Sequence, residues 1–302
     1  MNAYLRALRL ERWPRSLAIY SGVAAFFFLH RGAFFSFSLV ELAGRAAGAF
    51  LLTWTISTAN YVINEIADRP FDAHHPTKSR RPLVLGEIRQ GLFASIGLGL
   101  TAASLGAGAL AFSPSFLISL AGLFAAGIIY NVKPIRSKDI PFLDSISESA
   151  NNPIRFLIGW FAFAPRDLLP PAALLLGWWA FGNFLMVAKR LSEFRFLKEK
   201  ASDYRTSHKR YTKASLLAGM IVSAVACLAG FLYFAAVYRL ESFFAIAPFL
   251  LVFIVLIFRK TLNEAEVMEE PEKLLANSRY AIYVFFLLAL FILAFFKDTI
   301  GR

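Results

Sequence analysis

The amino-acid sequence predicts an all-α membrane protein with nine transmembrane helices in one bundle. Of its 302 residues, 58% are hydrophobic and only 17% are charged, and the mean hydropathy is +0.56. Soluble domains contain about 25% charged residues, so a soluble protein of this length could not bury its apolar surface. The apolar residues are also grouped into stretches close to the ~20 residues that a bilayer-spanning helix requires.

Nine apolar stretches account for the predicted helices. They cover residues 14–31, 39–66, 91–111, 114–131, 140–164, 168–190, 212–236, 241–258 and 278–296. The first stretch follows several arginines, as in a signal peptide, but the bulky residues after Leu29 leave no small-residue cleavage site. We therefore expect this stretch to remain in the protein as its first transmembrane helix.

The distribution of Lys and Arg predicts the orientation, because cytoplasmic loops of membrane proteins retain these residues. The basic regions are the N-terminus and the connections 67–90, 132–139, 189–211 and 259–277. The N-terminus is therefore expected inside and, since nine is odd, the C-terminus outside. This topology accounts for most of the net charge of +12, and no nucleic-acid partner is expected.

No Gly/Ser linker or low-complexity tract divides the chain, so residues 1–302 are expected to form a single polytopic domain. The longest polar segments, 64–90 and 189–213, both fall on the cytoplasmic side. Together with the short connection 131–139, these segments are where we expect the active site.

Polar residues at the end of the second stretch indicate a metal site. Asn60, Asn64 and Asp68 are four residues apart, so they share one face of a helix. Pro70 disfavours helix at the residue before it, so Asp72 is expected on a turn beyond the helix end. Two carboxylates at the negative end of a helix favour a cation. Mg²⁺ fits, because it takes one or two protein carboxylates and completes its coordination with water and phosphate oxygens.

The loop that follows adds cations close to these carboxylates. Lys78 and Arg81 are of the type that binds phosphate oxygens, so carboxylates for a metal beside them fit a diphosphate. His74 and His75 are interpreted as solvated or as partners of a carboxylate, rather than as metal ligands. The alternative is that the acidic and basic residues only cap the helix end and neutralise each other.

A second set of polar residues surrounds the start of the fifth stretch. The connection before it contains Tyr130, Asn131, Lys133, Arg136, Lys138 and Asp139. Within the stretch, Asp144, Glu148, Asn151, Asn152 and Arg155 are spaced so that they share one helix face. Ionisable residues at this depth are costly and normally face a protein-lined or wet cavity. The alternative is an internal salt bridge between Glu148 and Arg155 that only joins helices.

The sixth stretch ends in Lys189, Arg190 and Glu193, and Tyr211 follows in the next loop. The alternative to a functional role is that Lys189 and Glu193, which are four residues apart, only pair on a surface. Arg45 is a further ionisable residue within a span, and it is assigned no function. The single cysteine, Cys227, excludes an intrachain disulfide and a cysteine metal cluster.

These motifs resemble those of the UbiA-type intramembrane prenyltransferase superfamily, whose members are nine-helix bundles with two acidic motifs on cytoplasmic loops. Residues 64–72, Asn-Glu-Ile-Ala-Asp-Arg-Pro-Phe-Asp, resemble the first motif, Asn-Asp-x-x-Asp-x-x-x-Asp, with Glu65 in place of an Asp. Asp144 and Glu148 stand where the second motif is expected. Within the superfamily, His75-Pro76-x-Lys78-x-x-Arg81-Pro82, Lys189-Arg190-x-x-Glu193 and Tyr211-Thr212 look most like decaprenyl-phosphate phosphoribosyltransferases.

The resemblance implies Mg²⁺-dependent transfer of 5-phosphoribose from phosphoribosyl diphosphate to a polyprenyl phosphate, in a bacterial or archaeal cell membrane. Asn64, Asp68 and Asp72 would hold Mg²⁺, and Asp68, Asp72 and Asp144 would be the catalytic residues. The expected substrate-binding residues are Lys78, Arg81, Tyr130, Lys133, Arg136, Lys138, Glu148, Asn151, Asn152, Arg155, Lys189, Arg190, Glu193 and Tyr211. Both acidic motifs are expected to converge on one metal-bound diphosphate near the cytoplasmic surface.

Two other functions remain open. The same metal site would serve a UbiA-type enzyme that moves a prenyl group from a prenyl diphosphate to an aromatic acceptor. Phosphoribosyl diphosphate carries a further phosphate and two hydroxyls, and the many cations and hydrogen-bonding side chains of this chain favour it. The third function is a transporter or lipid-binding protein whose buried charges line a path, although we see no internal repeat typical of transporters beyond the two acidic motifs.

Overall fold

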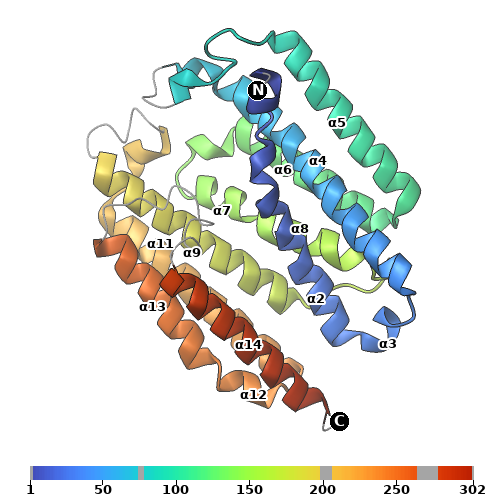
Figure 1. Cartoon of the computed structure of the whole chain (residues 1–302). Helices are drawn as coiled ribbons and strands as arrows, with labels where there is room; N and C mark the ends of the chain where they lie inside the picture. Colours follow the sequence, from blue (N-terminus) through green and yellow to red (C-terminus); the bar gives the residue numbers. More distant parts are fainter. Residues whose placement is uncertain (1–2, 74–77, 198–205, 264–277, 301–302) are drawn as a thin grey trace. The chain divides into compact units, whose positions relative to one another are not determined.

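The computed structural model describes residues 3–73, 78–197, 206–263 and 278–300, which form helices and connections and contain no β-strand. Figure 1 shows the chain coloured along its sequence. In chain order the helices are α1 (Ala3–Ala7), η1 (Leu10–Ala18), α2 (Ile19–Leu29), α3 (Arg31–Phe34), α4 (Leu39–Asp72), η2 (Lys78–Arg80), α5 (Gln90–Ala111), α6 (Pro114–Asn131), η3 (Ser137–Asp139), α7 (Leu143–Ser149), α8 (Asn151–Phe161), α9 (Ala172–Leu197), η5 (Thr206–Arg210), α11 (Lys213–Val237), α12 (Glu241–Phe244), α13 (Ala247–Asn263) and α14 (Ser278–Ile300). The predicted all-α class is confirmed for these residues.

Seven helical segments in the described part of the chain are long and apolar enough to cross a membrane. They are α4, α5, α6, α9, α11, α14 and the segment Glu241–Asn263, which contains α12 and α13. Each coincides with one of the nine apolar stretches of the sequence. The chain is therefore a multi-pass membrane protein.

The other two apolar stretches are helical but divided. Stretch 14–31 contains the end of η1 and then α2, and stretch 140–164 contains α7 and α8 with a break at Ala150. Pro153 lies in the first turn of α8 and has no N–H to bond the carbonyl of Ser149, which favours a break at this position. The count of nine spans and the orientation in the membrane stay predictions.

Local sequence fixes where the long helices begin. The hydroxyl of Ser38 accepts a hydrogen bond from the N–H of Glu41 at 3.3 Å, and the Glu41 carboxylate accepts one from the N–H of Ser38 at 2.8 Å. This reciprocal capping box satisfies N–H groups that would lack a partner at the start of α4. Ser113 caps α6 in a similar way, and Pro114 occupies its first position, where the missing N–H costs nothing.

The structure divides into two compact units, and each is described by itself. The first unit consists of Met1–Lys138 and Ala150–Pro170, and the second consists of Asp139–Ser149 and Pro171–Arg302. In the first unit, α4 packs against α5 and α6, and α2 packs against α8 (Figure 1). The amide of Asn60 on α4 donates to the carbonyl of Leu123 on α6 at 2.9 Å, which joins these two helices by a polar contact.

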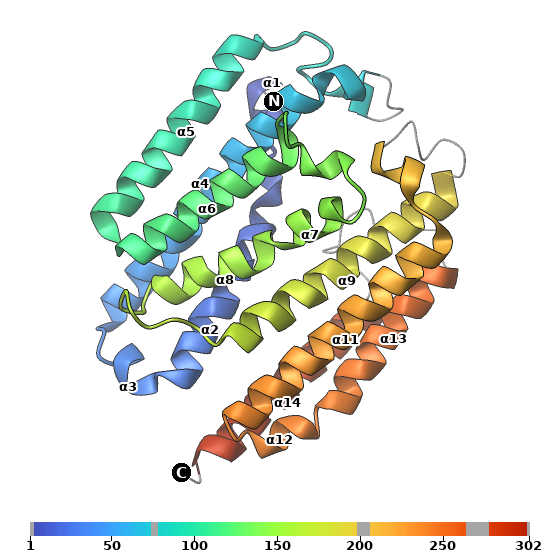
Figure 2. The ribbon, with the colours of Figure 1, turned by 180° about the vertical axis from the view of Figure 1, so that it is seen from behind.

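In the second unit, α9 and α11 lie side by side (Figure 2). Asn183 Nδ2 donates to Ser223 Oγ at 2.9 Å, and Gly177 lies opposite Gly230, so the two helices run antiparallel. Further along the unit, the N–H of Ser242 at α12 donates to the Asp298 carboxylate of α14 at 2.9 Å. Polar side chains thus join apolar helices in this unit, as in other helical membrane proteins.

The crossing of α2 and α8 depends on two glycines. A Cβ atom at Gly22 would lie 2.0 Å from the carbonyl oxygen of Phe156, and one at Gly159 would lie 1.9 Å from that of Ile19. Both neighbours are backbone atoms, which cannot move without separating the helices. Small residues at such crossings allow helix backbones to approach closely in a membrane.

We therefore expect Gly159→Ala to destabilise the first unit by roughly 1–3 kcal/mol, the usual cost of overpacking a well-packed interior. Thermal unfolding of the detergent-solubilised protein measures this as a lower Tm. Gly106→Ala on α5 is the matched control, because a Cβ atom there meets nothing within 4 Å. An equal Tm for Gly159→Ala and the parent protein would contradict the close crossing.

Candidate functional site

Three buried or half-buried carboxylates at the end of α4 form the first acidic cluster, which consists of Glu65, Asp68 and Asp72. Glu65 and Asp72 are only 2% and 3% exposed. Asp72 is the last residue of α4, so its predicted position on a turn beyond the helix is wrong. Pro70 lies in the final turn of α4. The proline removes one backbone hydrogen bond, but only two helical residues follow it, and the helix continues to Asp72.

Asp68 is held by two cations from the connection after α6. Its Oδ1 atom accepts a hydrogen bond from Arg136 Nη2 at 2.9 Å and another from Lys138 Nζ. Asn131 at the end of α6 supports both cations, because its backbone carbonyl accepts from Arg136 at 2.9 Å and its Oδ1 accepts from Lys138 at 2.8 Å. Arg136 also lies over the ring of Phe71, with Cζ 4.6 Å from the ring centroid. Arg136 and Lys138 are thus held in place by residues of both α6 and α4.

Asp72 and Glu65 share a different set of cations. Arg81 is paired with Asp72 and lies with Nη1 3.4 Å from Glu65 Oε1, and Lys78 Nζ lies 3.8 Å from Asp72 Oδ1. Glu65 is also paired with Arg9 from the N-terminal segment. Arg81 therefore contacts both Asp72 and Glu65, and Arg9 is a second cationic partner of Glu65.

The N-terminal segment is held against the loop that carries Arg81. A small apolar core contains Ala7, Val62, Leu83, Ile88 and Phe93, with Ala3, Tyr4, Leu8 and Ile66 packed around it. The hydroxyl of Tyr4 accepts a hydrogen bond from the N–H of Arg89 at 3.1 Å. Packing of α1 on this loop thus places Arg9 beside Glu65.

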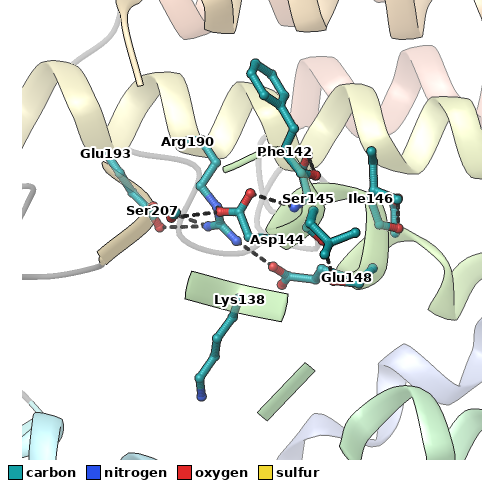
Figure 3. A network of polar contacts seen from close by, with 12 residues as sticks. Lys138, Phe142, Asp144, Ser145, Ile146, Glu148, Arg190, Glu193 and Ser207 are labelled. Carbon is teal, nitrogen blue, oxygen red and sulfur yellow. Dashed lines mark hydrogen bonds and ion pairs between the residues drawn. The ribbon is translucent and has the colours of Figure 1, made fainter. Parts of the chain in front are cut away.

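Three carboxylates around one guanidinium form the second acidic cluster, which consists of Asp144 and Glu148 on α7 and Glu193 on α9. Arg190 is fully buried, with 0% exposure. Its Nε donates to Asp144 at 2.7 Å, its Nη2 to Glu148 at 2.7 Å, and its Nη1 to Glu193 at 3.2 Å (Figure 3). A guanidinium has five N–H donors in a planar fork, which allows one side chain to hold three carboxylates.

The segment after α9 completes the hydrogen bonding of this cluster. Ser207 Oγ donates to Asp144 Oδ2 at 3.1 Å, the hydroxyl of Tyr211 donates to Asp144 Oδ1, and the N–H of Ser145 donates to the same oxygen at 2.8 Å. Burial and the negative charge of Asp144 raise the pKa of the Tyr211 hydroxyl above its ordinary value, so it stays protonated and acts as a donor. Asp144 is thereby saturated by four hydrogen bonds.

Glu193 is buried, so the alternative of a surface pair between Lys189 and Glu193 is wrong in placing this carboxylate on a surface. It accepts from Arg190, and His208 Nε2 lies 3.0 Å from its Oε2. Because a carboxylate only accepts hydrogen bonds, Nε2 is the donor in this contact. The other ring nitrogen of His208 is buried and has no hydrogen-bond partner among the described residues.

Strained backbone lies at both clusters. Four non-glycine residues in the described part of the chain have positive φ, and three of them are Arg9 (53°), Arg136 (36°) and Phe142 (63°). Arg9 and Arg136 hold the first acidic cluster, and the N–H of Phe142 donates to the Tyr211 hydroxyl at 2.7 Å. Such conformations cost about 1–3 kcal/mol each and persist where surrounding contacts over-determine them, as they often do at functional sites.

The remaining predicted site residues lie as follows. Lys133 is exposed, and Asn64, Tyr130, Asn151, Asn152, Arg155 and Lys189 are half-buried. Asp144 and Glu148 lie on α7, whereas Asn151, Asn152 and Arg155 lie on α8, after the break at Ala150. The single polar face that the spacing predicts stays a prediction. His74, His75, Pro76 and Thr77 of the loop after α4 lie outside the described residues.

Sequence reasoning missed Arg9, Ser207 and His208. Arg9 was visible only as one of several N-terminal arginines, and nothing in its spacing links it to Glu65, 56 residues later in the chain. Ser207 and His208 stand in a basic loop, where a short polar residue and a histidine carry no periodic signal. Their roles depend on tertiary packing, which residue spacing does not reveal.

The first acidic cluster has the chemistry of a magnesium site. Asp68 Oδ2 accepts no hydrogen bond from the described residues, and the side chain of Asn64, one helical turn earlier, makes none with them. Carboxylate and amide oxygens are hard ligands of the kind that Mg²⁺ takes. Among the described residues, no three His, Cys, Asp or Glu side chains are grouped closely enough to hold a metal by themselves. Mg²⁺ is usually held by only one or two carboxylates plus substrate phosphates, so the residues fit.

Comparison with known proteins identifies the family to which this chain is similar. Residues 18–287 match the model of the UbiA prenyltransferase family. The decaprenyl-phosphate phosphoribosyltransferase of Mycobacterium tuberculosis (strain ATCC 25618 / H37Rv) is 24% identical over 223 residues, which cover 74% of this chain and 70% of that protein. The enzyme of the same name from Mycolicibacterium smegmatis is 24% identical over 229 residues, covering 75% of this chain and 68% of that protein.

The fold is also similar to that of a solved structure. A UbiA homolog from Archaeoglobus fulgidus bound to GPP and Mg²⁺ superimposes with a TM-score of 0.70 at 19% sequence identity, over 97% of this chain and 99% of that one. The family match spans most of the sequence. The chain belongs to the UbiA prenyltransferase family.

Proposed function

We propose that this protein catalyses Mg²⁺-dependent transfer of 5-phosphoribose from phosphoribosyl diphosphate to a polyprenyl phosphate. The observation that carries the proposal is the composition of the site at the end of α4. Five cationic side chains, Arg9, Lys78, Arg81, Arg136 and Lys138, surround three carboxylates. The group as a whole is positively charged, which suits a donor with a diphosphate and a further phosphate.

The named relatives support the same reaction. Decaprenyl-phosphate phosphoribosyltransferases from two mycobacterial species resemble about three quarters of this chain. Their names describe a polyprenyl phosphate as the acceptor and phosphoribose as the transferred group. The sequence resembles this branch of the family at Lys78 and Arg81 after α4 and at Lys189, Arg190 and Glu193 of α9.

Asn64, Asp68 and Asp72 would hold the magnesium ion. When bound, Mg²⁺ neutralises negative charge on a diphosphate and makes it a better leaving group. Lys78, Arg81, Arg136 and Lys138, which pair with Asp68 and Asp72, are also placed to bind the phosphates of the donor. Arg136 and Lys138 are buried and fixed through Asn131, so they approach a phosphate with little loss of conformational freedom.

In the second acidic cluster, we assign Arg190 a positioning role rather than direct contact with phosphate. Its guanidinium is fully buried and is engaged by Asp144, Glu148 and Glu193. A carboxylate buried without such a partner would be strongly disfavoured. Tyr211 acts on Asp144 in the same way. Glu148, Asn151 and Asn152 are assigned to the ribose hydroxyls, and Arg155, Lys133 and Lys189 to phosphate groups. Asp144 is fully buried and is held by Arg190, so it is assigned a positioning role as well.

The transfer itself requires no strong base. The bond between C1 of ribose and the diphosphate oxygen breaks with both electrons leaving on diphosphate, and an oxygen of the lipid phosphate forms the new bond to C1. A phosphate monoester is already ionised near neutral pH, so its oxygen needs no proton removed. Rate enhancement then comes from holding both phosphates in place and stabilising the departing charge.

A second function is transfer of a prenyl group from a prenyl diphosphate to an aromatic acceptor. It is favoured by the similar fold of the Archaeoglobus fulgidus homolog bound to GPP and Mg²⁺. The diphosphate and its metal would use the same carboxylates. The two donors differ in the additional phosphate and hydroxyls of phosphoribosyl diphosphate, so the identity of the donor is what experiment must decide.

We expect Asp68→Asn and Asp72→Asn each to lower transfer activity at least ~100-fold in a folded protein, because each removes a carboxylate proposed to hold Mg²⁺. The measurement is release of diphosphate at saturating substrate over a range of Mg²⁺ concentrations. The matched control is Glu87→Gln, which removes an exposed carboxylate that also pairs with an arginine, Arg6. Its activity should stay within about twofold, since exposed pairs contribute little. Near-normal activity of either aspartate variant would contradict the proposed metal site.

A two-substrate comparison distinguishes the donors. Purified protein is incubated with Mg²⁺, a polyprenyl phosphate and phosphoribosyl diphosphate labelled in its ribose, and separately with a labelled prenyl diphosphate and an aromatic acid. The proposal expects the ribose label to enter the chloroform phase only when the polyprenyl phosphate is present. If that label stays in water while the aromatic acid is prenylated, the second function is correct.

A further inference from the structure

A cavity lies at the other end of the first unit, where α4 begins. Its volume is ≈ 430 Å³, and its lining includes Phe37, Arg45, Phe112, Ser113 and Phe163. These residues come from the start of α4, the turn between α5 and α6, and the segment after α8. Arg45 is 23 residues before Asp68 on the same helix, so about 35 Å of helix separates this cavity from the first acidic cluster.

Arg45 makes no direct ion pair among the described residues, and its nearest anion is the exposed Glu41, whose charge it feels across one turn of α4. Its Nη1 donates to the backbone carbonyl of Ala162 at 3.1 Å, and its Cζ lies 4.9 Å from the centroid of the Phe37 ring. Glu41, one turn earlier, is engaged in the capping box with Ser38. A charged residue inside a membrane span is costly and normally has a specific partner. The guanidinium retains N–H donors that the Ala162 carbonyl does not use.

A second positively polarised group faces the same cavity. Ser113, in its lining, is the cap of α6, an 18-residue helix whose first turn therefore begins at the wall of the cavity. The positive end of a helix dipole favours an anion. In α6 this is the main contribution, because Pro114 has no N–H and the N–H of Phe116 already bonds the Ser113 hydroxyl. Together, the guanidinium and the start of α6 are suited to a phosphate.

The apolar surroundings indicate that this phosphate belongs to a lipid. The aromatic rings of Phe37, Phe112 and Phe163 line the cavity. Large apolar side chains close to the lining residues in sequence are almost fully exposed: Leu39 at 80%, Val40 at 82% and Leu110 at 91%. Exposed apolar side chains at the end of a membrane span contact acyl chains, so a lipid reaches this cavity by lateral diffusion.

We propose that the cavity is a binding site for the phosphate of an anionic phospholipid such as phosphatidylglycerol. Arg45 donates charge-assisted hydrogen bonds to the phosphate oxygens, the positive end of the α6 dipole adds a weaker attraction, and the aromatic rings pack against the glycerol and upper acyl chains. The site is independent of the proposed transfer reaction, since its residues lie at the opposite end of α4 from Asp68.

The test is native mass spectrometry of the full-length protein in detergent, titrated with phosphatidylglycerol or phosphatidylcholine. We expect one saturable site that prefers phosphatidylglycerol. Arg45→Gln should weaken it roughly tenfold or more, as expected for loss of a hydrogen bond to a charged group. Ala111→Leu, which fills the cavity while keeping Arg45, should weaken it as well. The control is Arg166→Gln, which removes an exposed arginine outside the lining of the cavity and should bind as the parent protein does.

Equal affinity of the parent protein, Arg45→Gln and Ala111→Leu for phosphatidylglycerol would overturn the proposal, and so would an equal loss in Arg166→Gln. Competition by inorganic phosphate at millimolar concentration would also overturn it, because the site would then be one for a soluble anion. Transfer activity of Arg45→Gln should equal that of the parent protein, so a failure of this proposal and a failure of the proposed function give different results.

Discussion

Burial of carboxylates beside guanidinium groups is the constraint on which the rest of this structure depends. A carboxylate removed from water is strongly disfavoured unless a positive partner and hydrogen bonds replace its hydration. Arg190 meets this requirement for Asp144, Glu148 and Glu193, and Arg81 meets it for Glu65 and Asp72. The positions of the segments that contain these arginines therefore depend on charge pairing as well as on apolar packing.

The two acidic clusters are held by different sets of cations. At the end of α4, five cationic side chains surround three carboxylates, whereas in the second cluster the single guanidinium of Arg190 contacts all three carboxylates. The many cations at the end of α4 suit the phosphates of the proposed donor.

Periodic features of the sequence were predictable, and features that depend on distant contacts were not. Apolar stretches located seven long helices, and the four-residue spacing placed Asn64 with Asp68 and Asp144 with Glu148. Spacing gave no account of the pairing of Arg9 with Glu65, because that contact requires α1 to pack on the loop after α4. The effect of Pro70 was also misjudged. A proline near a helix end is tolerated when few residues follow it, as before Asp72.

The central claim is that Asp68 and Asp72 hold a magnesium ion that binds a diphosphate. Equilibrium binding of inorganic diphosphate to the detergent-solubilised protein tests this claim without requiring knowledge of the donor. The account predicts that binding requires Mg²⁺ and weakens at least ~100-fold in Asp68→Asn, the loss expected when a metal ligand is removed. Diphosphate binding of equal strength without Mg²⁺, or unchanged binding in Asp68→Asn, would contradict it.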